Sequence, residues 1–311
     1  MKKDRVAVLM GGYSNERDIS LRSGYAVLGA LRRKNIDVIP FDPKERLIHE
    51  LVDEKITKVF IALHGSFGED GQVQAILEYL KIPFTGSGMA ASSLAINKIQ
   101  TKRILETLNL KTPRFLQIST SDFKNFDNEA LFFPAIIKPN KEGSSLGVKK
   151  INSITEFESS ILELSSYGST FLFEEFIQGA ELTCAILQDN TSAPPVALPV
   201  IEVIAPGGDY NFYNKYVSKE TRYICPAKLP DCISKKIQDD SKRAFVGLGC
   251  RHWARVDFIW DKENDPDILE VNTVPGMTEQ SLVPMAALQK GLSFDDLVMS
   301  LLNNASLENG E

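Results

Sequence analysis

The segment WARVDFIW occupies residues 253–260, and the segment DILEVNTV occupies residues 267–274. Apolar and polar side chains alternate in both, which is typical of β-strands that bury one face. The polar stretch 261–266 joins them and favours an antiparallel hairpin. We therefore expect two neighbouring strands whose side chains can be paired across the hairpin by residue number.

Polar side chains on one face of this hairpin are expected to converge. A hairpin centred near residues 263–264 places Glu270 opposite Asp257 and Asn272 opposite Arg255, and the two-residue period puts all four on one face. Carboxylate and carboxamide oxygens are the hard ligands that suit Mg²⁺ shared with phosphates. A solvated sheet face is the alternative interpretation, and the TVPGM turn that follows favours the metal site.

The N-terminal part of the chain alternates between expected strands and helices. The expected strands are Val6–Met10, Asp37–Phe41 and Lys58–Leu63, and the expected helices are Ser20–Lys34, Glu45–Asp53 and Gly71–Leu80. Such alternation predicts a parallel sheet with helices on both faces, and ligands bind at the carboxyl ends of its strands. Two polar loops follow expected strands there, GGYSNERDIS at residues 11–20 and HGSFGEDG at residues 64–71.

Two further units follow, so we expect domains at residues 1–95, 96–181 and 182–311. The second unit is expected to contain helix Asn97–Leu108, a strand from Ala135, strand Val148–Ile151, a helix around Glu156–Leu164 and strand Phe171–Phe176. The third contains the hairpin, a polar aromatic loop at Gly207–Ser218 and a helix near Phe294–Asn303.

Two motifs of the second unit suit a nucleotide. Lys138 ends an apolar strand, and EGSSLGV at residues 142–148 brings glycines and hydroxyls that can face a phosphate. Strand FLFEEFI at residues 171–177 could offer its backbone to an adenine, with Glu181 beyond it for ribose hydroxyls. Taken alone, an ordinary glycine-serine hairpin and an edge strand with charged residues are the alternatives.

Composition excludes several classes of protein. A formal net charge of −6 gives no basic excess for nucleic acid. No apolar run reaches the ~20 residues of a membrane span, and the N-terminal apolar run is too short for a signal peptide. The four cysteines and three histidines lack zinc-site spacing, so we expect free cysteines in a reducing cytoplasm. GGYSNE also lacks the GxGxxG pattern of a Rossmann dehydrogenase.

Together the motifs resemble those of the D-alanine–D-alanine ligases, a family of the ATP-grasp superfamily. The matching segments, in order, are GGYSNERDISLRSG, HGSFGEDG, INK, IIKPNKEGSSLGV, FLFEEFIQGAELT, NKYVSKETRYICPA, ARVDFIW and LEVNTVPGMTEQSLVPMAA, and they run from residue 11 to residue 287. The resemblance implies an α/β ATP-grasp fold with an N-terminal parallel α/β domain, a central α+β lid domain over ATP and a C-terminal α+β domain.

The resemblance also implies the residues of the nucleotide site. ATP would be bound by Lys98, Lys138, Ser145, Glu174, the backbone of Glu175, Phe176 and Ile177, and Glu181. Two Mg²⁺ (or Mn²⁺) ions would be bound by Asp257, Glu270 and Asn272, in agreement with the hairpin pairing. Ser144 and neighbouring amides would cover the γ-phosphate.

The resemblance implies the amino-acid site as well. Glu16 would pair with the ammonium group of a first D-alanine, beside His64. Lys215 and Ser281 would hold the carboxylate of a second D-alanine, with Leu282 nearby. Arg255 and the Gly276 amide would stabilise the oxyanion, and Tyr216, Ser144 and Glu16 would form a hydrogen-bonded link that closes a mobile loop.

The implied reaction joins two D-alanines through a D-alanyl phosphate, releases ADP and phosphate, and supplies peptidoglycan precursors. A cytoplasmic homodimer that binds neither nucleic acid nor membrane is expected. The alternatives are another ATP-grasp amino-acid ligase, such as one with D-serine as acceptor, and an inactive nucleotide sensor. Asn211 and Phe212 depart from a Tyr-Asp-Tyr-like run, which puts in doubt any loop-closing contact from these two positions.

Overall fold

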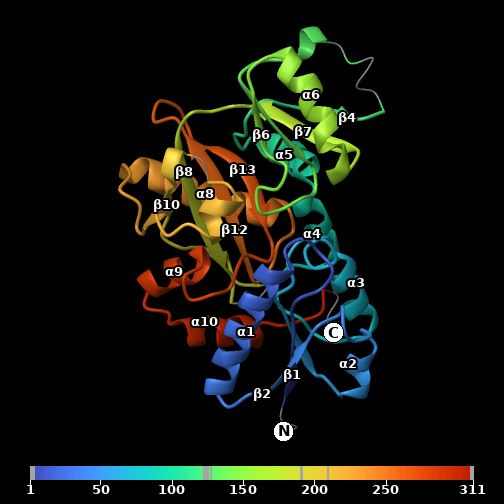
Figure 1. Cartoon of the computed structure of the whole chain (residues 1–311). Coiled ribbons are helices and arrows are strands. Elements are labelled where there is room, and N and C mark those ends of the chain that lie inside the picture. Colours follow the sequence, from blue (N-terminus) through green and yellow to red (C-terminus); the bar gives the residue numbers. More distant parts are fainter. Residues whose placement is uncertain (1–3, 122–125, 127, 190–191, 209, 309–311) are drawn as a thin grey trace.

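The computed structural model describes residues 4–121, 126, 128–189, 192–208 and 210–308, and three sheets organise them (Figure 1). The strands are β1 Arg5–Leu9, β2 Asp37–Phe41, β3 Lys58–Ile61, β4 Phe115–Ser119, β5 Ala135–Pro139, β6 Lys149–Ile151, β7 Thr170–Glu175, β8 Ala180–Leu187, β9 Val196–Ala197, β10 Ile201–Ile204, β11 Arg222–Ile224, β12 Trp253–Trp260 and β13 Asp267–Asn272. The α-helices are α1 Arg17–Arg33, α2 Glu50–Asp53, α3 Gln72–Tyr79, α4 Met89–Ile96, α5 Lys98–Thr107, α6 Ile154–Leu164, α7 Phe212–Tyr216, α8 Asp231–Gly247, α9 Leu282–Gln289 and α10 Phe294–Asn303.

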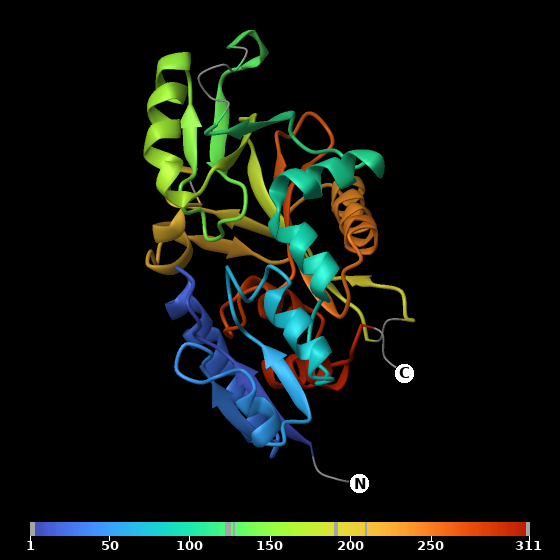
Figure 2. The same ribbon diagram turned by 90° about the vertical axis from the view of Figure 1, so that its right-hand side faces the viewer.

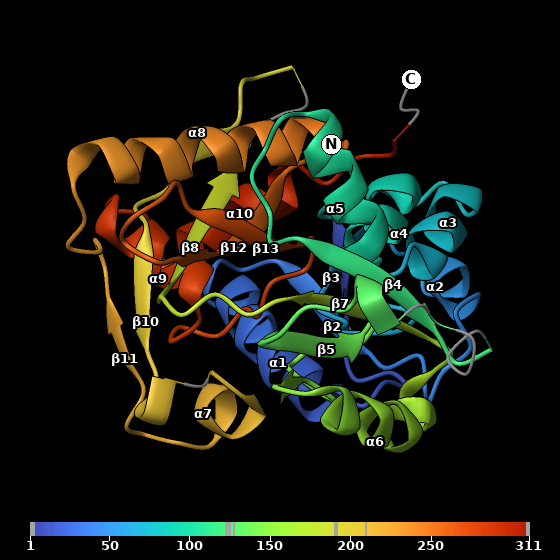
Figure 3. The same cartoon turned by 90° about the horizontal axis from the view of Figure 1, so that it is seen from above.

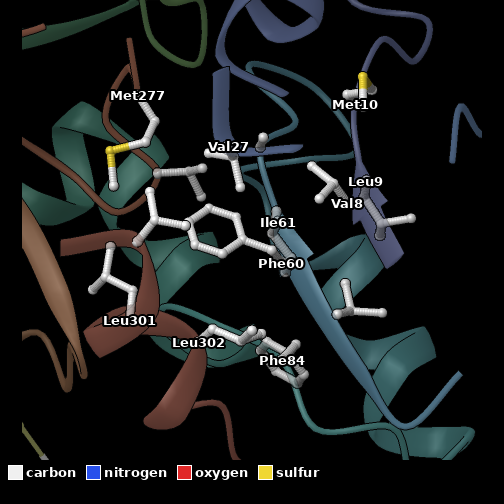
Figure 4. Close-up of a cluster of buried hydrophobic side chains, with 14 of the residues drawn as sticks. Val8, Leu9, Met10, Val27, Phe60, Ile61, Phe84, Met277, Leu301 and Leu302 are labelled. Carbon is white, nitrogen blue, oxygen red and sulfur yellow. The ribbon is translucent and has the colours of Figure 1, made fainter. Parts of the chain in front are cut away.

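The N-terminal sheet is parallel, as predicted, with strand order β2-β1-β3. Its central strand β1 is an unbroken apolar run because both faces are covered, and residues 6–9 are fully buried. Helix α10 comes from the far end of the chain and packs on α1 and β3. In Figure 4, Leu301 and Leu302 of α10 lie beside Phe60 and Phe84. The N-terminal core therefore includes residues of the predicted C-terminal domain.

The second sheet is antiparallel, with strand order β4-β7-β5-β6. Helix α6 covers it, and Phe157 of the helix packs edge-on against Phe173 of β7 at 5.5 Å between ring centroids. This sheet and α6 form the upper lobe in Figure 1, and Figure 2 shows the same lobe from the side. The lobe stands above the rest of the molecule, in a position to cover whatever binds below it.

The third sheet has the strand order β11-β10-β8-β12-β13, with β9 paired to β8, and α8 runs along it (Figure 3). The hairpin of β12 and β13 has the predicted register, with Asp257 opposite Glu270 and Arg255 opposite Asn272. A bulge between Asp257 and Phe258 shifts the pairing by one residue beyond that point. The residue-number pairing is thus confirmed where the polar side chains lie.

Several predicted boundaries were wrong. The helix expected over Glu45–Asp53 is only α2, because the amides of Glu45 and Arg46 bond to the carbonyl of Asp42 in a turn. Helix α4 precedes Asn97 and was not predicted, since its mixed small and apolar residues lack a clear face. The loop Gly207–Ser218 contains helix α7, and its residue Asp209 lies outside the described residues.

The third sheet begins with β8 at Ala180, two residues before the expected domain boundary. No helix in the described ranges has the length and apolar character needed to cross a bilayer.

Candidate active site

Two cavities meet between the three sheets. The larger has a volume of about 580 Å³ and lies between α1, the β13–α9 turn and α7. The smaller has a volume of about 270 Å³ and lies between the second and third sheets. Both are lined by Gly143, Ser144, Tyr210, Lys215, Glu270 and Leu282. A ligand in one cavity therefore borders a ligand in the other.

The smaller cavity has a mixed apolar and charged lining. Ile136, Phe176 and Ile177 form part of its wall. Glu174 on β7 is 2 % exposed, and its Oε2 atom pairs with Lys102 Nζ at 2.8 Å. A carboxylate oxygen has two lone pairs, so this buried group beside an apolar wall can still accept the exocyclic amino group of an adenine. The cavity thus fits a purine nucleotide on the evidence of its own atoms.

Two buried lysines extend this cavity toward the larger one. Lys138 Nζ on β5 lies 2.5 Å from Glu174 Oε1. Lys98 Nζ, at the start of α5, donates to the Glu142 carbonyl at 2.6 Å and lies 3.7 Å from Glu270 Oε2. Burial alone would lower the pKa of Lys138, but the charges of Glu174 and Glu270 raise it. Lys138 therefore stays protonated at physiological pH and can pair with a phosphate.

The glycine-serine loop turns sharply over this region. Ser144, Ser145 and Gly147 all have positive φ values, of 51°, 57° and 69°. Successive backbone amides in a turn can face a bound anion, so the loop can present its N–H groups to a phosphate. Ser145 Oγ donates to the carbonyl of Tyr210 at 3.2 Å, so the loop contacts the segment that precedes α7.

The carboxylates predicted to bind metal face each other across the hairpin. Within the described ranges, no three His, Cys, Asp or Glu side chains form a metal-binding group. The predicted ligands are two carboxylates and one carboxamide, from Asp257, Glu270 and Asn272. This all-oxygen donor set fits Mg²⁺ that takes its other ligands from phosphates and water. Burial would raise the pKa of Glu270, but Lys98 and Lys138 lower it to about 2, so it stays ionised.

Arg255 occupies the space beside these carboxylates. Its Nε and Nη2 atoms donate to Asp257 at 2.8 and 2.7 Å. Asn272 Nδ2 and Thr183 Oγ1 also donate to Asp257, at 3.0 and 2.6 Å. Arg255 also lines the larger cavity, together with Glu270 and Asn272.

Three residues from distant segments meet at the junction of the cavities, as predicted. Glu16 precedes α1, Ser144 lies in the glycine-serine loop, and Tyr216 ends α7. Ser144 Oγ donates to Glu16 Oε1 and lies 3.1 Å from Tyr216 Oη. Burial and the charge of Glu69 raise the pKa of Glu16, and burial raises that of Tyr216 to about 12. Tyr216 is therefore a neutral phenol at physiological pH.

His64 is buried against the larger cavity, and the sequence motifs did not predict which side chains contact it. Its Nε2 atom lies 3.1 Å from Ser23 Oγ, and its Nδ1 atom lies 3.9 Å from Glu69 Oε1. Ser23 Oγ also accepts the Met277 amide at 3.1 Å, which ties His64 to the turn that carries Gly276. Ser23 and Glu69 both lie within quoted motifs, but spacing alone does not reveal a contact with the distant turn.

The remaining predicted residues of the amino-acid site also line the larger cavity. They are Lys215, Gly276, Ser281 and Leu282. Ser281 Oγ accepts the amide of Thr278 at 3.0 Å. Glu175, Phe176, Ile177 and Glu181 line the smaller cavity with Ser145. The structure thus gathers the predicted residues into the two cavities, although their roles remain predictions.

The departure at Asn211 and Phe212 has a structural explanation. Asn211 is the N-cap of α7, and its side chain accepts the Asn214 amide at 3.0 Å. Asparagine and aspartate are equally good N-caps, so the lost carboxylate does not cost the helix its start. The Phe212 ring packs on Tyr216 at 5.1 Å between centroids. Both residues therefore support the helix that carries Lys215 and Tyr216.

Comparisons with known proteins agree with this geometry. The protein-family model described as D-ala D-ala ligase C-terminus matches residues 104–303, and the family model described as D-ala D-ala ligase N-terminus matches residues 43–87. D-alanine–D-alanine ligases from Cupriavidus metallidurans and Nitrosomonas europaea are 44% and 45% identical over 308 and 298 residues. The first alignment covers 98% of this chain and 92% of the relative, and the second covers 96% of each.

Solved structures of similar proteins also match this fold over nearly the whole chain. The crystal structure of D-alanine–D-alanine ligase from Bacillus anthracis complexed with ATP superimposes with a TM-score of 0.84 at 30% identity and covers 97% of both chains. VanG D-Ala:D-Ser ligase from Enterococcus faecalis gives a TM-score of 0.83 at 26% identity, covering 96% of this chain and 98% of that one. The second and third sheets enclose a cavity lined by lysines and carboxylates, and this arrangement defines an ATP-grasp enzyme. Within that class, the chain belongs to the D-alanine–D-alanine ligase family.

Proposed function

We propose that this enzyme joins two D-alanine molecules into D-alanyl-D-alanine at the expense of ATP, with ADP and phosphate as the other products. One observation carries the proposal. The two cavities share a wall that contains Ser144 and Glu270. The smaller cavity suits a nucleotide, and the larger one is lined by charged groups that suit the ammonium and carboxylate groups of amino acids. A carboxylate in the larger cavity can therefore meet a terminal phosphate in the smaller one.

ATP is a substrate, and in the proposed arrangement its adenine lies against Phe176 and Ile177, with its amino group on Glu174. Glu181 lies on the same wall and would accept the ribose hydroxyls. Lys98 and Lys138 would bind the phosphates, and the amides and hydroxyls of Ser144 and Ser145 would cover the terminal one. Such positioning and charge stabilisation provide most of the catalysis in phosphoryl transfer.

Asp257, Glu270 and Asn272 would hold Mg²⁺ (or Mn²⁺), which supplies charge neutralisation for the phosphate oxygens. The chain's own contribution is to keep these oxygens fixed on neighbouring strands. Their pairing across β12 and β13 holds them in one patch before any ligand arrives.

The first D-alanine would bind through its ammonium group to Glu16, with His64 beside it. Its carboxylate oxygen attacks the γ-phosphorus, and the bond from that phosphorus to ADP breaks. The product is an acyl phosphate, in which phosphate replaces oxide as the leaving group. Tyr216 and Ser144 would hold α7 and the glycine-serine loop against Glu16 and exclude water, which would otherwise hydrolyse this intermediate.

The second D-alanine would bind through its carboxylate to Lys215 and Ser281, next to Leu282. Its deprotonated amine attacks the acyl carbon, and phosphate leaves the tetrahedral intermediate. Arg255 and the Gly276 amide would stabilise the oxyanion. Removal of one such donor costs other enzymes about 10²–10³-fold in rate.

We also propose that the enzyme acts in the cytoplasm as a homodimer, on peptidoglycan precursors and without nucleic acid or membrane as partner. The family resemblance supports the dimer, and the net charge of −6 argues against nucleic acid. Light scattering after size-exclusion chromatography tests the dimer directly, and a monomer mass at micromolar concentration refutes it.

The test of the activity is phosphate release from ATP and Mg²⁺ with four substrate sets: D-alanine, L-alanine, D-alanine plus D-lactate, and D-alanine plus D-serine. Products are identified by mass. The proposal expects release with D-alanine alone and D-alanyl-D-alanine as the product. No release with D-alanine, under conditions where ATP binding is demonstrated, refutes it. A preferred D-alanyl-D-serine product would instead identify the acceptor as D-serine.

A further inference from the structure

Lys102 is a fully buried lysine that the reaction described above does not use. It lies on α5, one turn after Lys98, so the two side chains share one face of the helix. Its Nζ atom lies 2.8 Å from Glu174 Oε2, donates to Thr112 Oγ1 at 2.6 Å and lies 5.6 Å from the centre of the Phe115 ring. A lysine is rarely buried in this way unless it is paired.

Glu174 thus stands between two lysines. Its Oε1 atom contacts Lys138, and its Oε2 atom contacts Lys102. All three side chains are at most about one-tenth exposed, so solvent screens their charges weakly. Two ammonium groups and one carboxylate leave a net charge of +1. Without Lys102 the group is neutral, because the charge of Lys138 is then balanced by Glu174.

The contact of Lys102 with Glu174 differs from that of Lys138. Lys102 Nζ pairs with Glu174 Oε2 at 2.8 Å, and because a carboxylate oxygen has two lone pairs, Oε2 can still accept another donor. Burial lowers the pKa of Lys102, whereas nearby carboxylates raise that of Lys138. Lys102 faces the protein interior, and Lys138 lines the nucleotide cavity.

We propose that Lys102 is a positioning residue that balances the charge of Glu174 and so leaves the charge of Lys138 available to the triphosphate. This inference rests on the proposed function, in which Lys138 meets the phosphates. The three buried residues then have separate roles. Glu174 recognises the base, Lys138 binds phosphate, and Lys102 prevents the charge of Glu174 from neutralising that of Lys138.

A purely structural ion pair is the competing explanation, since removal of one partner of a buried pair destabilises proteins strongly. The two explanations differ in what nucleotide binding depends on. A structural role affects all nucleotide binding equally or not at all. The proposed role affects ATP, which carries phosphates, and spares adenosine, which does not.

The experiment measures calorimetric affinities for ATP with Mg²⁺ and for adenosine, in enzyme shown to be folded by circular dichroism. Lys102→Met is expected to weaken ATP by about 10–100-fold and adenosine by less than about threefold, because one unit charge is lost in a weakly screened site. Lys111→Met is the matched control. It breaks the 2.8 Å contact with Asp267 and leaves Glu174 untouched, so both affinities should stay unchanged.

Two further variants keep the test decisive. Lys102→Met combined with Glu174→Gln has no carboxylate at position 174 to neutralise Lys138, so it should restore the ratio of ATP to adenosine affinity to within about threefold of the wild type. The proposal is overturned if folded Lys102→Met weakens the binding of ATP and adenosine equally, or weakens neither. It is also overturned if the folded double variant keeps a ratio of ATP to adenosine affinity that is reduced about tenfold or more. Lys138→Met must reduce the ratio by itself. If it does not, the proposed nucleotide site is wrong irrespective of Lys102.

Discussion

Gly143→Ala should damage the amino-acid site while leaving the fold intact. The φ of Gly143 lies outside the left-handed region, so the backbone accepts alanine. A Cβ atom at this position would lie 2.6 Å from Glu16 Oε2, whereas ordinary contact begins at 3.4 Å. The carboxylate must therefore retreat by about 0.8 Å. That movement is cheap for stability because it involves the end of a flexible side chain.

The functional cost should be larger than the structural cost. A misplacement of about 1 Å can reduce catalysis by about 10²-fold, so we expect kcat/KM for D-alanine to fall by about 10–100-fold. The KM for ATP should change by less than about threefold, and the Tm should remain within a few degrees. Steady-state kinetics at varied D-alanine and a thermal melt measure these quantities.

Two further variants separate this mechanism from a general effect of alanine. At Gly29 on α1, a Cβ atom would lie 3.4 Å from Arg33 Nη1, which is ordinary contact, so Gly29→Ala should leave the kinetics unchanged. Glu16→Asp shortens the carboxylate, so adding Gly143→Ala to it should cost much less than Gly143→Ala costs the wild type. Additive losses in the double variant, or an unchanged kcat/KM in Gly143→Ala itself, would refute the reasoning.

Three other perturbations test separate parts of the site. Ser144→Ala removes a hydrogen bond that lowers the pKa of Glu16. Because Glu16 must be ionised to pair with an ammonium group, the acid limb of the profile of kcat/KM against pH should move to higher pH. A shift to lower pH would contradict this reasoning. Asn211→Ala removes the N-cap of α7 at a cost of about 1 kcal/mol, which should speed amide hydrogen exchange at Asn214, whereas Asn211→Asp should preserve protection. Asp257→Asn should raise the Mg²⁺ concentration for half-maximal activity by about tenfold or more, because one carboxylate ligand is lost, and an unchanged Mg²⁺ titration would exclude Asp257 as a ligand.

Much of this protein could be read from its sequence because the governing patterns are local. The two-residue period of the hairpin fixed which side chains of β12 and β13 share a face, and the short linker fixed that Asp257 pairs with Glu270. The alternation of strands and helices likewise predicted a parallel sheet, and the polar loop after β1 predicted that Glu16 lies near its carboxyl edge. Motif order then indicated which residues would gather around a nucleotide and two amino acids.

Tertiary structure alone decided the contacts between segments that no local pattern relates. Lys102 and Glu174 are far apart in the sequence, and neither the helical period of α5 nor the alternation of β7 indicates that they meet. Helix α10 has a clear apolar face, but the sequence does not reveal that this face packs against α1 and β3. Helix α7 is short and has little intrinsic stability, so its formation depends on the Asn211 cap and on the packing of Phe212 against Tyr216. Periodicity specifies the face that a segment buries, whereas the partner of that face is selected by the packing of the whole chain.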